Sequence, residues 1–492
     1  MNNSESAQRP AVPGESSAMR SAFAHSGAAL EFRSRAAKNA SVLDGLIKTE
    51  GDANRRILFR DATIVTGKAD QSVVHGNVLV VGGRIAEVGP GAGAGVDETN
   101  AVVIDASDSI LMPGFVDSHL HAWEGQLRGM SPDADFDEYL DVAHKSLATH
   151  YRPHDTYIGN LVSSLVSLYT GVTTIIDNSH NSRSADHSSA AVEALFDSGI
   201  RAVHAAAAPR FGEWDRQWPA DLDRLQGEYF TSADQLVTLR MMDTTADPAE
   251  WRFAHERGLW VSSEMGSDWV DNLVELHELG LVTDKHTFNH VLGLSEEEWR
   301  IIADTGVKVN VSPRSDTLFG LGPSFPAIND ALAHGVRPGL SMDNELSYGV
   351  DMFTEMSVLT HLQRGGVYGR RNAAEENVPA PITAADAIEF ATLRGAENAG
   401  LIDRTGSIEV GKQADIILID TTAPNTIPAT DPVATVVAYA HPGNVAAVFV
   451  DGVVRKWDGH LVGVDMHTIR QVAEQSRDWL FAEAEKAAST ES

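Results

Sequence analysis

Short apolar segments alternate with helical segments through the middle of the chain. Each apolar segment is bounded by turn residues, which is typical of strands buried in a parallel sheet. Eight such segments occur, at residues 114–121, 171–180, 200–211, 237–242, 259–265, 285–291, 307–313 and 336–343. Helical stretches such as HSSAAVEALFDSG and DPAEWRFAHERG separate them. The alternation predicts an α/β fold with a (β/α)8 TIM barrel.

Apolar runs and glycine turns with the pattern of hairpin strands flank the predicted barrel on both sides. They occupy residues 57–67 and 76–90 before it, and residues 406–420 and 445–459 after it. We expect the two flanks to pair as one small β-sandwich-like domain. The predicted parts are an N-terminal tail (1–54), the first part of the β domain (55–112), the barrel (113–400), the second part of the β domain (401–465) and a C-terminal helix (466–492).

Composition places the chain among globular proteins, with 43% hydrophobic and 22% charged residues. The tail is rich in Ser, Ala, Asn and Gly, with one short helix expected around SVLDGLIKTE. It lacks the pattern of a secretory signal, and no run approaches the roughly 18 apolar residues of a membrane span. We therefore expect a cytoplasmic protein without a membrane partner. The chain has no cysteine, so a metal would have to bind to His, Asp and Glu.

The charge balance is strongly acidic, since 38 Lys and Arg face 69 Asp and Glu, a formal net charge of 38 − 69 = −31. Nucleic acid is not an expected partner, because phosphate binding needs a basic patch and no basic run occurs. The balance favours solubility and argues against a strongly anionic substrate.

Candidate metal ligands lie at the ends of predicted strands. His119 and His121 end the first barrel strand, and residues i and i+2 of a strand point to the same side, so both imidazoles can reach one ion. Asp343 ends the eighth strand and His290 ends the sixth. Catalytic groups of a TIM barrel lie at this face. The alternatives are a helix N-cap for Asp343 and a structural role for the histidines.

Several longer motifs resemble the amidohydrolase superfamily, within it the cytosine deaminase and chlorohydrolase-like branch. They include LMPGFVDSHLHAWEGQLRG, GVTTIID, NHVLGLSEEEW, VSPRSDTLFGLG, GLSMDN and EFATLRGAENAGLIDRTGSIEVGKQADIILID, in the family order over residues 56 to 462. The resemblance implies the barrel, the β domain and one divalent metal ion at the barrel mouth. The implied ligands are His119, His121, position 264 and Asp343.

Position 264 departs from the family pattern, in which the fifth strand carries a histidine. Counting from Gly258, the metal position falls on Glu264 and the position of the family's acid/base glutamate falls on Ser267. A second register makes Glu264 the acid/base residue and leaves Val261 at the metal position. We prefer the first register. Two histidines with two carboxylates suit Zn, Fe or Mn, and His290 as a replacement ligand is a further alternative.

In the first register the family's acid/base glutamate is missing, which bears on the mechanism. Ser267 cannot carry a proton at neutral pH, and Asp268 is the nearest other candidate. We expect Asp343 to accept the proton of the attacking water and His290 to polarise the substrate, with Glu264 as the third residue of the catalytic set.

Four residues that follow the second and third barrel strands are candidates for substrate binding. They are His180, His204, Arg210 and Trp214. Arg210 and Trp214 would suit an aromatic or carboxylate-bearing ligand, whereas ordinary structural roles are the alternative for all four.

The resulting hypothesis is a metal-dependent amidohydrolase that hydrolyses a C–N bond, or a similar leaving group, of a small cyclic compound, by deamination or by amide or ring hydrolysis. The alternative is a non-hydrolytic lyase, decarboxylase or isomerase on the same barrel, and a binding protein without catalysis is a third possibility. Expected partners are a small-molecule substrate and further copies of the chain in a homo-oligomer.

Overall fold

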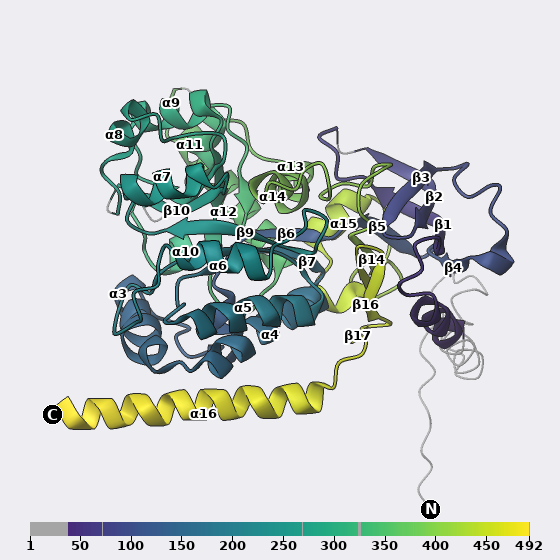
Figure 1. Cartoon of the computed structure of the whole chain (residues 1–492). Coiled ribbons are helices and arrows are strands. Elements are labelled where there is room, and N and C mark those ends of the chain that lie inside the picture. Colours follow the sequence, from purple (N-terminus) through teal and green to yellow (C-terminus); the bar gives the residue numbers. More distant parts are fainter. Residues whose placement is uncertain (1–37, 71, 268, 323–325, 377, 492) are drawn as a thin grey trace, which may run out of the picture. The chain divides into compact units, whose positions relative to one another are not determined.

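The structure is a computed structural model that describes residues 38–70, 72–267, 269–322, 326–376 and 378–491 (Figure 1). Residues up to Thr49 form a separate unit. Within it, residues 38–48 form a helix, close to the short helix predicted around SVLDGLIKTE. All further elements belong to the second unit, which begins at Glu50.

The two flanks of the chain pair in a single nine-stranded sheet, as predicted. Its strands from the first flank are β1 (Arg56–Val65), β2 (Val73–Val81), β3 (Arg84–Gly89), β4 (Val102–Asp105) and β5 (Ser109–Pro113). The second flank contributes β14 (Ile416–Asp420), β15 (Val445–Val450), β16 (Val453–Trp457) and β17 (His460–Leu461). Strands β14 and β5 pair antiparallel and join the flanks.

The sheet is strongly bent, which gives the domain its sandwich-like character. Strands β1 and β15 are separated in the sheet by β5 and β14. A flat sheet would hold them about 14 Å apart, because neighbouring strands are spaced by about 4.8 Å. Yet the rings of Phe59 on β1 and Phe449 on β15 contact each other edge to face, with centroids 5.2 Å apart. The two halves of the sheet therefore face each other over an apolar core.

The barrel contains the eight predicted strands, all parallel and in sequence order. They are β6 (Phe115–Leu120), β7 (Val172–Ser179), β8 (Arg201–Ala206), β9 (Val237–Asp243), β10 (Val261–Gly266), β11 (His286–Leu292), β12 (Lys308–Val311) and β13 (Gly339–Leu340). The prediction of a (β/α)8 barrel with a β domain built from both flanks is confirmed.

Closure of the barrel between β13 and β6 runs through a short bridge at its mouth. Leu120 and Asp343 pair as parallel neighbours. The backbone N–H of Asp343 donates to the carbonyl of His119 at 2.9 Å, and the N–H of His121 donates to the carbonyl of Asp343 at 2.7 Å. Asp343 adopts a positive φ of 63°, a conformation that Asp tolerates better than most residues. Candidate ligands thus form the seam of the barrel.

Helices follow the barrel strands in turn (Figure 1). After β6 come α3 (Phe136–Tyr139), the wide helical turn η3 (Leu140–Leu147) and α4 (Pro153–Thr170). The helices that follow strands β7 to β13 are α5 (Ala185–Ser198), α6 (Asp221–Glu228), α7 (Pro248–Glu256), α8 (Leu273–Glu278), α9 (Glu296–Thr305), α10 (Pro313–Leu318), α11 (Ile328–Ala333) and α12 (Met352–Asn372). Beyond the barrel lie α13 (Ala384–Glu389), α14 (Gly395–Asn398) and α15 (Pro432–Ala438).

Glycine ends three of the described helices that lead into barrel strands. Gly171 follows α4 with φ 96°, Gly199 follows α5 with φ 70° and Gly306 follows α9 with φ 73°, and all are left-handed C-caps. Since glycine has no Cβ, it turns the chain from helix to strand within one or two residues.

The C-terminal helix α16 (Met466–Glu491) lies along α4 (Figure 1). Leu480 is buried against the barrel, and the Ser476 hydroxyl donates to Asp155 in the first turn of α4 at 2.7 Å. The helix therefore packs on the outer side of the segment that follows β6.

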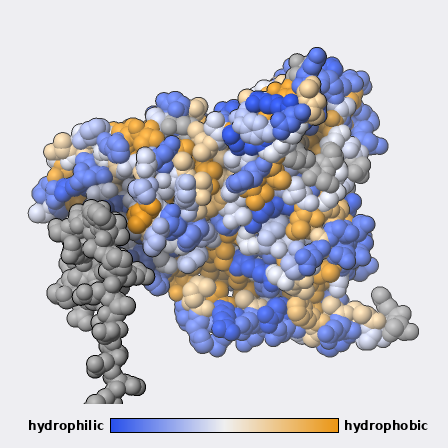
Figure 2. All heavy atoms as spheres, turned by 180° about the vertical axis from the view of Figure 1, so that it is seen from behind, coloured by the Kyte–Doolittle hydropathy of each residue, from blue (hydrophilic) through white to orange (hydrophobic). Residues whose placement is uncertain are grey.

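The outer surface mixes polar and apolar residues. Figure 2 shows hydrophilic residues spread over one face, with apolar residues between them in separate groups. No helix in the described part of the chain has both the length and the apolar character needed to cross a membrane.

A buried ion pair connects the barrel to the β domain. The Arg201 guanidinium at the start of β8 donates to Asp415, just before β14, at 2.6 and 3.0 Å, and neither side chain is exposed. The backbone N–H of Asp451 donates to the same carboxylate at 2.7 Å.

We predict that Asp415→Asn destabilises the protein strongly, because it leaves a buried guanidinium without its counter-charge. Breaking such a pair costs about 3–5 kcal/mol. The matched control is Glu474→Gln, which removes the exposed pair with Arg470 on α16 and should cost at most about 1 kcal/mol. Thermal unfolding of both variants measures the difference, and equal midpoints would contradict the prediction.

Candidate metal centre and cavity

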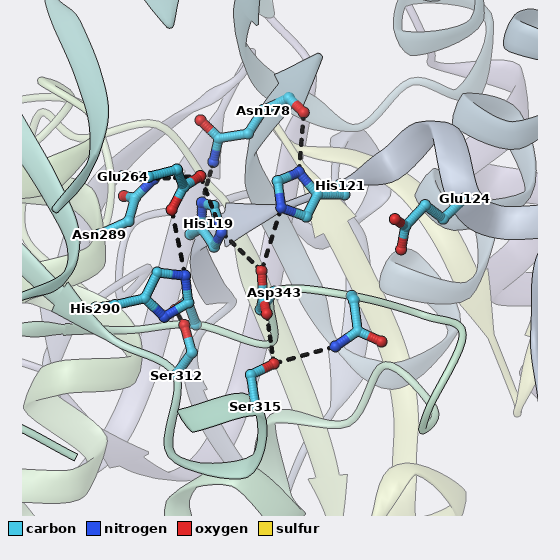
Figure 3. Close-up of polar contacts among 12 residues, drawn as sticks. His119, His121, Glu124, Asn178, Glu264, Asn289, His290, Ser312, Ser315 and Asp343 are labelled. Atoms are coloured by element: carbon cyan, nitrogen blue, oxygen red, sulfur yellow. Dashed lines mark hydrogen bonds and ion pairs between the residues drawn. The ribbon is translucent and has the colours of Figure 1, made fainter. Parts of the chain in front are cut away.

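The two histidines at the end of β6 point to one spot at the mouth of the barrel, where Asp343 meets them (Figure 3). The Asp343 Oδ1 atom lies 2.8 Å from His119 Nε2 and 3.3 Å from His121 Nε2. His119 is fully buried, and the other two residues are nearly so. Alternation along the strand puts both imidazoles on the same side, as predicted.

Glu264 on β10 completes this cluster. Its Oε1 atom lies 3.7 Å from His119 Nε2, and the Asn289 amide donates to the same oxygen at 3.3 Å. His119, His121 and Glu264 together form a group able to hold a metal ion. Val261 lies at the buried start of β10, three residues away. This arrangement supports the register in which Glu264 occupies the metal position.

His290 on β11 faces the cluster because of a β-bulge. Met265 of β10 pairs with His290 and Gly266 pairs with Leu292, which leaves Val291 as an extra residue. Both His290 and Val291 have positive φ, 65° and 50°, a strained conformation for such residues. The bulge brings His290 Nε2 to 3.2 Å from Glu264 Oε2, and His290 also forms a possible metal-binding group with His119 and Asp343.

Hydrogen bonds at the outer nitrogens orient the histidine rings. His121 Nδ1 donates to the carbonyl of Asn178 on β7 at 3.1 Å, and His290 Nδ1 donates to Asp316 at 2.7 Å. The Asn178 side chain contacts His119 Nδ1. These contacts leave the Nε2 atoms of all three rings directed at the cluster, which is the usual arrangement of histidines that bind metals.

A hydroxyl group fixes the second oxygen of Asp343. The Ser315 hydroxyl donates to Asp343 Oδ2 and contacts the Tyr348 hydroxyl, while the Asn344 amide donates to Ser315 Oγ at 3.1 Å. The Arg314 guanidinium stacks over the Tyr348 ring at 4.1 Å. Rotation of the Asp343 carboxylate is thereby restricted, and Oδ1 stays directed at His119 and His121.

The protonation of the cluster shows how strongly it attracts cations. Burial would lower the pKa of His121, but the hydrogen bond and charge of Asp343 raise it to about 9. Burial would likewise raise the pKa of Glu264, but the charges of His119 and His290 and the hydrogen bond from His290 lower it to about 2. Two buried carboxylates therefore draw protons onto the imidazoles, and a divalent cation would replace these protons.

The donor set fits a metal ion. Its contacts of 2.8, 3.3 and 3.7 Å bracket the separation of about 3.3–3.6 Å between ligand atoms around a tetrahedral ion. Glu264 Oε2 is buried and faces His290 Nε2 at 3.2 Å. His119 is shared by two groups able to hold an ion, one with His121 and Glu264 and one with His290 and Asp343.

A cavity opens beside the cluster. Its wall includes His121, Glu264, His290 and Asp343, together with aromatic side chains, His144, His180 and Arg210. Of the four residues predicted to bind substrate, His180 and Arg210 line this cavity.

The other two predicted substrate residues lie away from the cavity wall. His204 is fully buried in the barrel and contacts Asp177 through Nδ1 at 2.8 Å. Trp214 stacks under Arg216 at 4.5 Å. Ser267 is exposed beyond the end of β10, and Asp268 lies outside the described residues. No described carboxylate therefore takes the place of the family's acid/base glutamate on this strand.

Three residues of the site were not predicted individually from the sequence. Asn178 lies near the end of the second predicted barrel strand, in GVTTIIDNSH. Ser315 and Asp316 lie just after the seventh predicted strand, in SPRSD. Their roles depend on the partners that other strands bring to them, so no local pattern distinguishes them.

We predict that Glu264→Ala removes the metal from the purified protein, because the ion would lose one of two anionic ligands. Elemental analysis of the variant should show at most about a tenth of the wild-type metal content. Ser267→Ala, with its exposed side chain, is the matched control and should retain the metal. Equal metal content in wild type and Glu264→Ala would exclude Glu264 as a ligand.

Ser315→Ala should weaken metal binding about 10–100-fold, the usual effect of losing a hydrogen bond to a ligand. Competition with a chelator measures this affinity. Thr317→Val is the control, because Thr317 lies on the same helix and its hydroxyl donates to Pro313 instead. An unchanged affinity in Ser315→Ala would mean that Asp343 needs no hydroxyl partner.

Comparison with known proteins finds a family match over part of the chain. Residues 253–455 match the Amidohydrolase family. The chain is 26% identical to 5'-deoxyadenosine deaminase of Methanobrevibacter smithii over 443 residues, which cover 85% of this chain and 97% of the relative. It is 28% identical to 5-methylthioadenosine/S-adenosylhomocysteine deaminase of Symbiobacterium thermophilum over 432 residues, 81% of this chain and 92% of the relative.

Solved structures share the fold. An adenosine deaminase from Xanthomonas campestris with bound zinc superposes with a TM-score of 0.75 at 24% identity, over 87% of this chain and 98% of that one. Atrazine chlorohydrolase from Arthrobacter aurescens, complexed with zinc, gives a TM-score of 0.72 at 19% identity, over 86% of this chain and 100% of that one. The family match thus covers residues 253–455, and relatives in sequence and solved structures of the same fold extend the similarity over more than four fifths of the chain.

Proposed function

We propose that the protein is a metal-dependent hydrolase that cleaves a C–N bond of a small cyclic compound, with deamination as the favoured reaction. The observation that supports this most is the gathering of His119, His121, Glu264, His290 and Asp343 in two overlapping ligand groups, beside a cavity at the barrel mouth. The full-length relatives named above are deaminases, which favours an exocyclic amine as the leaving group.

The chain's own residues divide the work. His119, His121, Glu264 and Asp343 would hold one divalent ion, with Zn, Fe and Mn as the candidates that this donor set suits. Such an ion supplies Lewis acidity that makes a water molecule acidic enough to attack at neutral pH. The two carboxylates make the site more negative than one with three histidines, so the ion would be a weaker Lewis acid there.

Asp343 is the residue placed to accept the proton of the attacking water. Burial would raise its pKa, but hydrogen bonds and charge from His119 and His121 lower it well below the usual range, so the carboxylate is ionised. Ser315 holds Oδ2, which keeps the carboxylate at the edge of the cavity.

His290 is placed to protonate the leaving group. Burial would lower its pKa, but hydrogen bonds with Asp316 and Glu264 raise it well above the usual value. With Nδ1–H bound to Asp316, the Nε2–H faces the cluster and can be given to the departing amine. This role would compensate for Ser267, which carries no proton on β10. In the overall reaction the C–N bond breaks, a C–O bond to water forms, and the amine leaves with the proton.

Cytoplasmic location and a homo-oligomeric state stay predictions from the sequence. A small-molecule substrate fits the size and enclosure of the site.

Asp343→Asn should lower turnover about 10²–10⁴-fold while the thermal midpoint stays within a few degrees of wild type, because an amide cannot take the water proton. The assay is ammonia release from a panel of amino-substituted heteroaromatic compounds by metal-loaded protein, with a chelator as the negative control. Reactions in ¹⁸O-labelled water should place the label in the product. A product without label would overturn hydrolysis in favour of a lyase, decarboxylase or isomerase.

A further inference from the structure

The cavity has one apolar, aromatic side. Tyr139 and Phe319 stack with centroids 4.9 Å apart at 26°, and Phe136 and Trp269 lie next to them with centroids 5.7 Å apart. All four rings line the cavity. Flat aromatic walls favour a planar ring, because offset stacking and edge contacts add to the apolar area buried.

A pair of stacked imidazoles leads from the metal cluster into this cavity. The ring of His180 contacts that of His121, with centroids 4.5 Å apart. On its other side His180 stacks on His144, 4.8 Å away and nearly parallel at 7°. His180 Nδ1 is buried without a hydrogen bond among the described residues. The cavity thus offers a ligand an unpartnered polar atom beside the cluster.

Arg210 supplies the cationic group of the cavity wall. It is the one Lys or Arg among the described residues that line the cavity. It forms no ion pair with any described carboxylate, and its guanidinium lies 5.9 Å from the ring of its neighbour Phe211. Its charge acts on His144, at the end of the imidazole pair away from His121. Arg210 is an exposed residue, so its guanidinium is open to a ligand at the cavity.

The same wall offers little to a sugar diol. Such diols are usually bound by a carboxylate, as in dinucleotide sites. Among the described lining residues the carboxylates are Glu264 and Asp343, and both are directed at the cluster. The Tyr139 hydroxyl already donates to the buried Glu124 at 2.6 Å.

We propose that the substrate is a planar heteroaromatic compound with an acidic substituent, whose carboxylate or comparable anion binds Arg210 while the reacting ring carbon lies at the metal cluster. The aromatic rings would cover the plane of the ring, and the His144–His180 pair would follow its edge. This inference rests on the proposed function, because it names the substrate class of the same site.

The overall charge of −31 argues against an anionic ligand at long range. Within the cavity the local balance is different, since salt screens distant charges over about 10 Å, whereas a direct guanidinium–carboxylate contact is screened little. The expectation from composition would therefore not hold at this site.

The test is calorimetric binding of a matched pair of probes, quinoline-6-carboxylate and quinoline-6-carboxamide, which share a ring and differ in charge. Wild-type metal-loaded protein should bind the acid at least about tenfold more tightly than the amide. Arg210→Gln should remove this difference and leave binding of the amide within about twofold. Arg216→Gln is the matched control, because Arg216 lies in the same loop but stacks on Trp214 away from the cavity.

Three results would overturn the inference: acid and amide bind wild type alike, the acid does not bind, or Arg210→Gln keeps the preference. The last would mean that the carboxylate binds the metal instead. Since binding requires no turnover, an Arg210-dependent preference without ammonia release would leave the inference standing and overturn only the proposed function. Turnover without an acid preference would do the reverse.

Discussion

Backbone hydrogen bonds between His119, His121 and Asp343 close the barrel, and the candidate metal centre depends on them. His119, His121 and Asp343 belong to the seam between the first and last strands, whereas Glu264 comes from β10. Backbone hydrogen bonds of the barrel wall therefore fix the spacing of three of the four candidate ligands. Asp117 adds to this seam, because its buried carboxylate accepts from the N–H of Met342 at 3.1 Å.

Placing two carboxylates in this cluster has an electrostatic cost, which their partners offset. Asp343 faces two imidazoles and a hydroxyl, and Glu264 faces His119 and His290. A carboxylate at position 264 makes the cluster more anionic than an imidazole would, and the bulge on β11 brings His290 close enough to balance part of that charge. His290 and Val291 have positive φ at this bulge, a strained conformation for such residues.

The cavity wall combines this anionic centre with one cationic side chain among its described residues. Glu264 and Asp343 would direct a divalent ion to the cluster, while Arg210, the imidazole pair and the aromatic side chains form other parts of the wall. A site polarised in this way distinguishes the two ends of a ligand and orients it without many hydrogen bonds. The wide turn η3 contributes to this arrangement, since it places His144 against His180.

By itself the sequence determined the eight barrel strands, the β domain built from both flanks, and the strand-end positions of His119, His121, His290 and Asp343. These follow from local periodicity, because alternation along a strand decides which side chains share a face. Only the tertiary structure decided that Glu264 reaches His119, that Asn178, Ser315 and Asp316 orient the cluster, that His204 is enclosed with Asp177, and that Arg210 faces the cavity without a partner. Each of these depends on contacts between segments far apart in the chain, and no local pattern of residues encodes the partner that folding brings to a side chain.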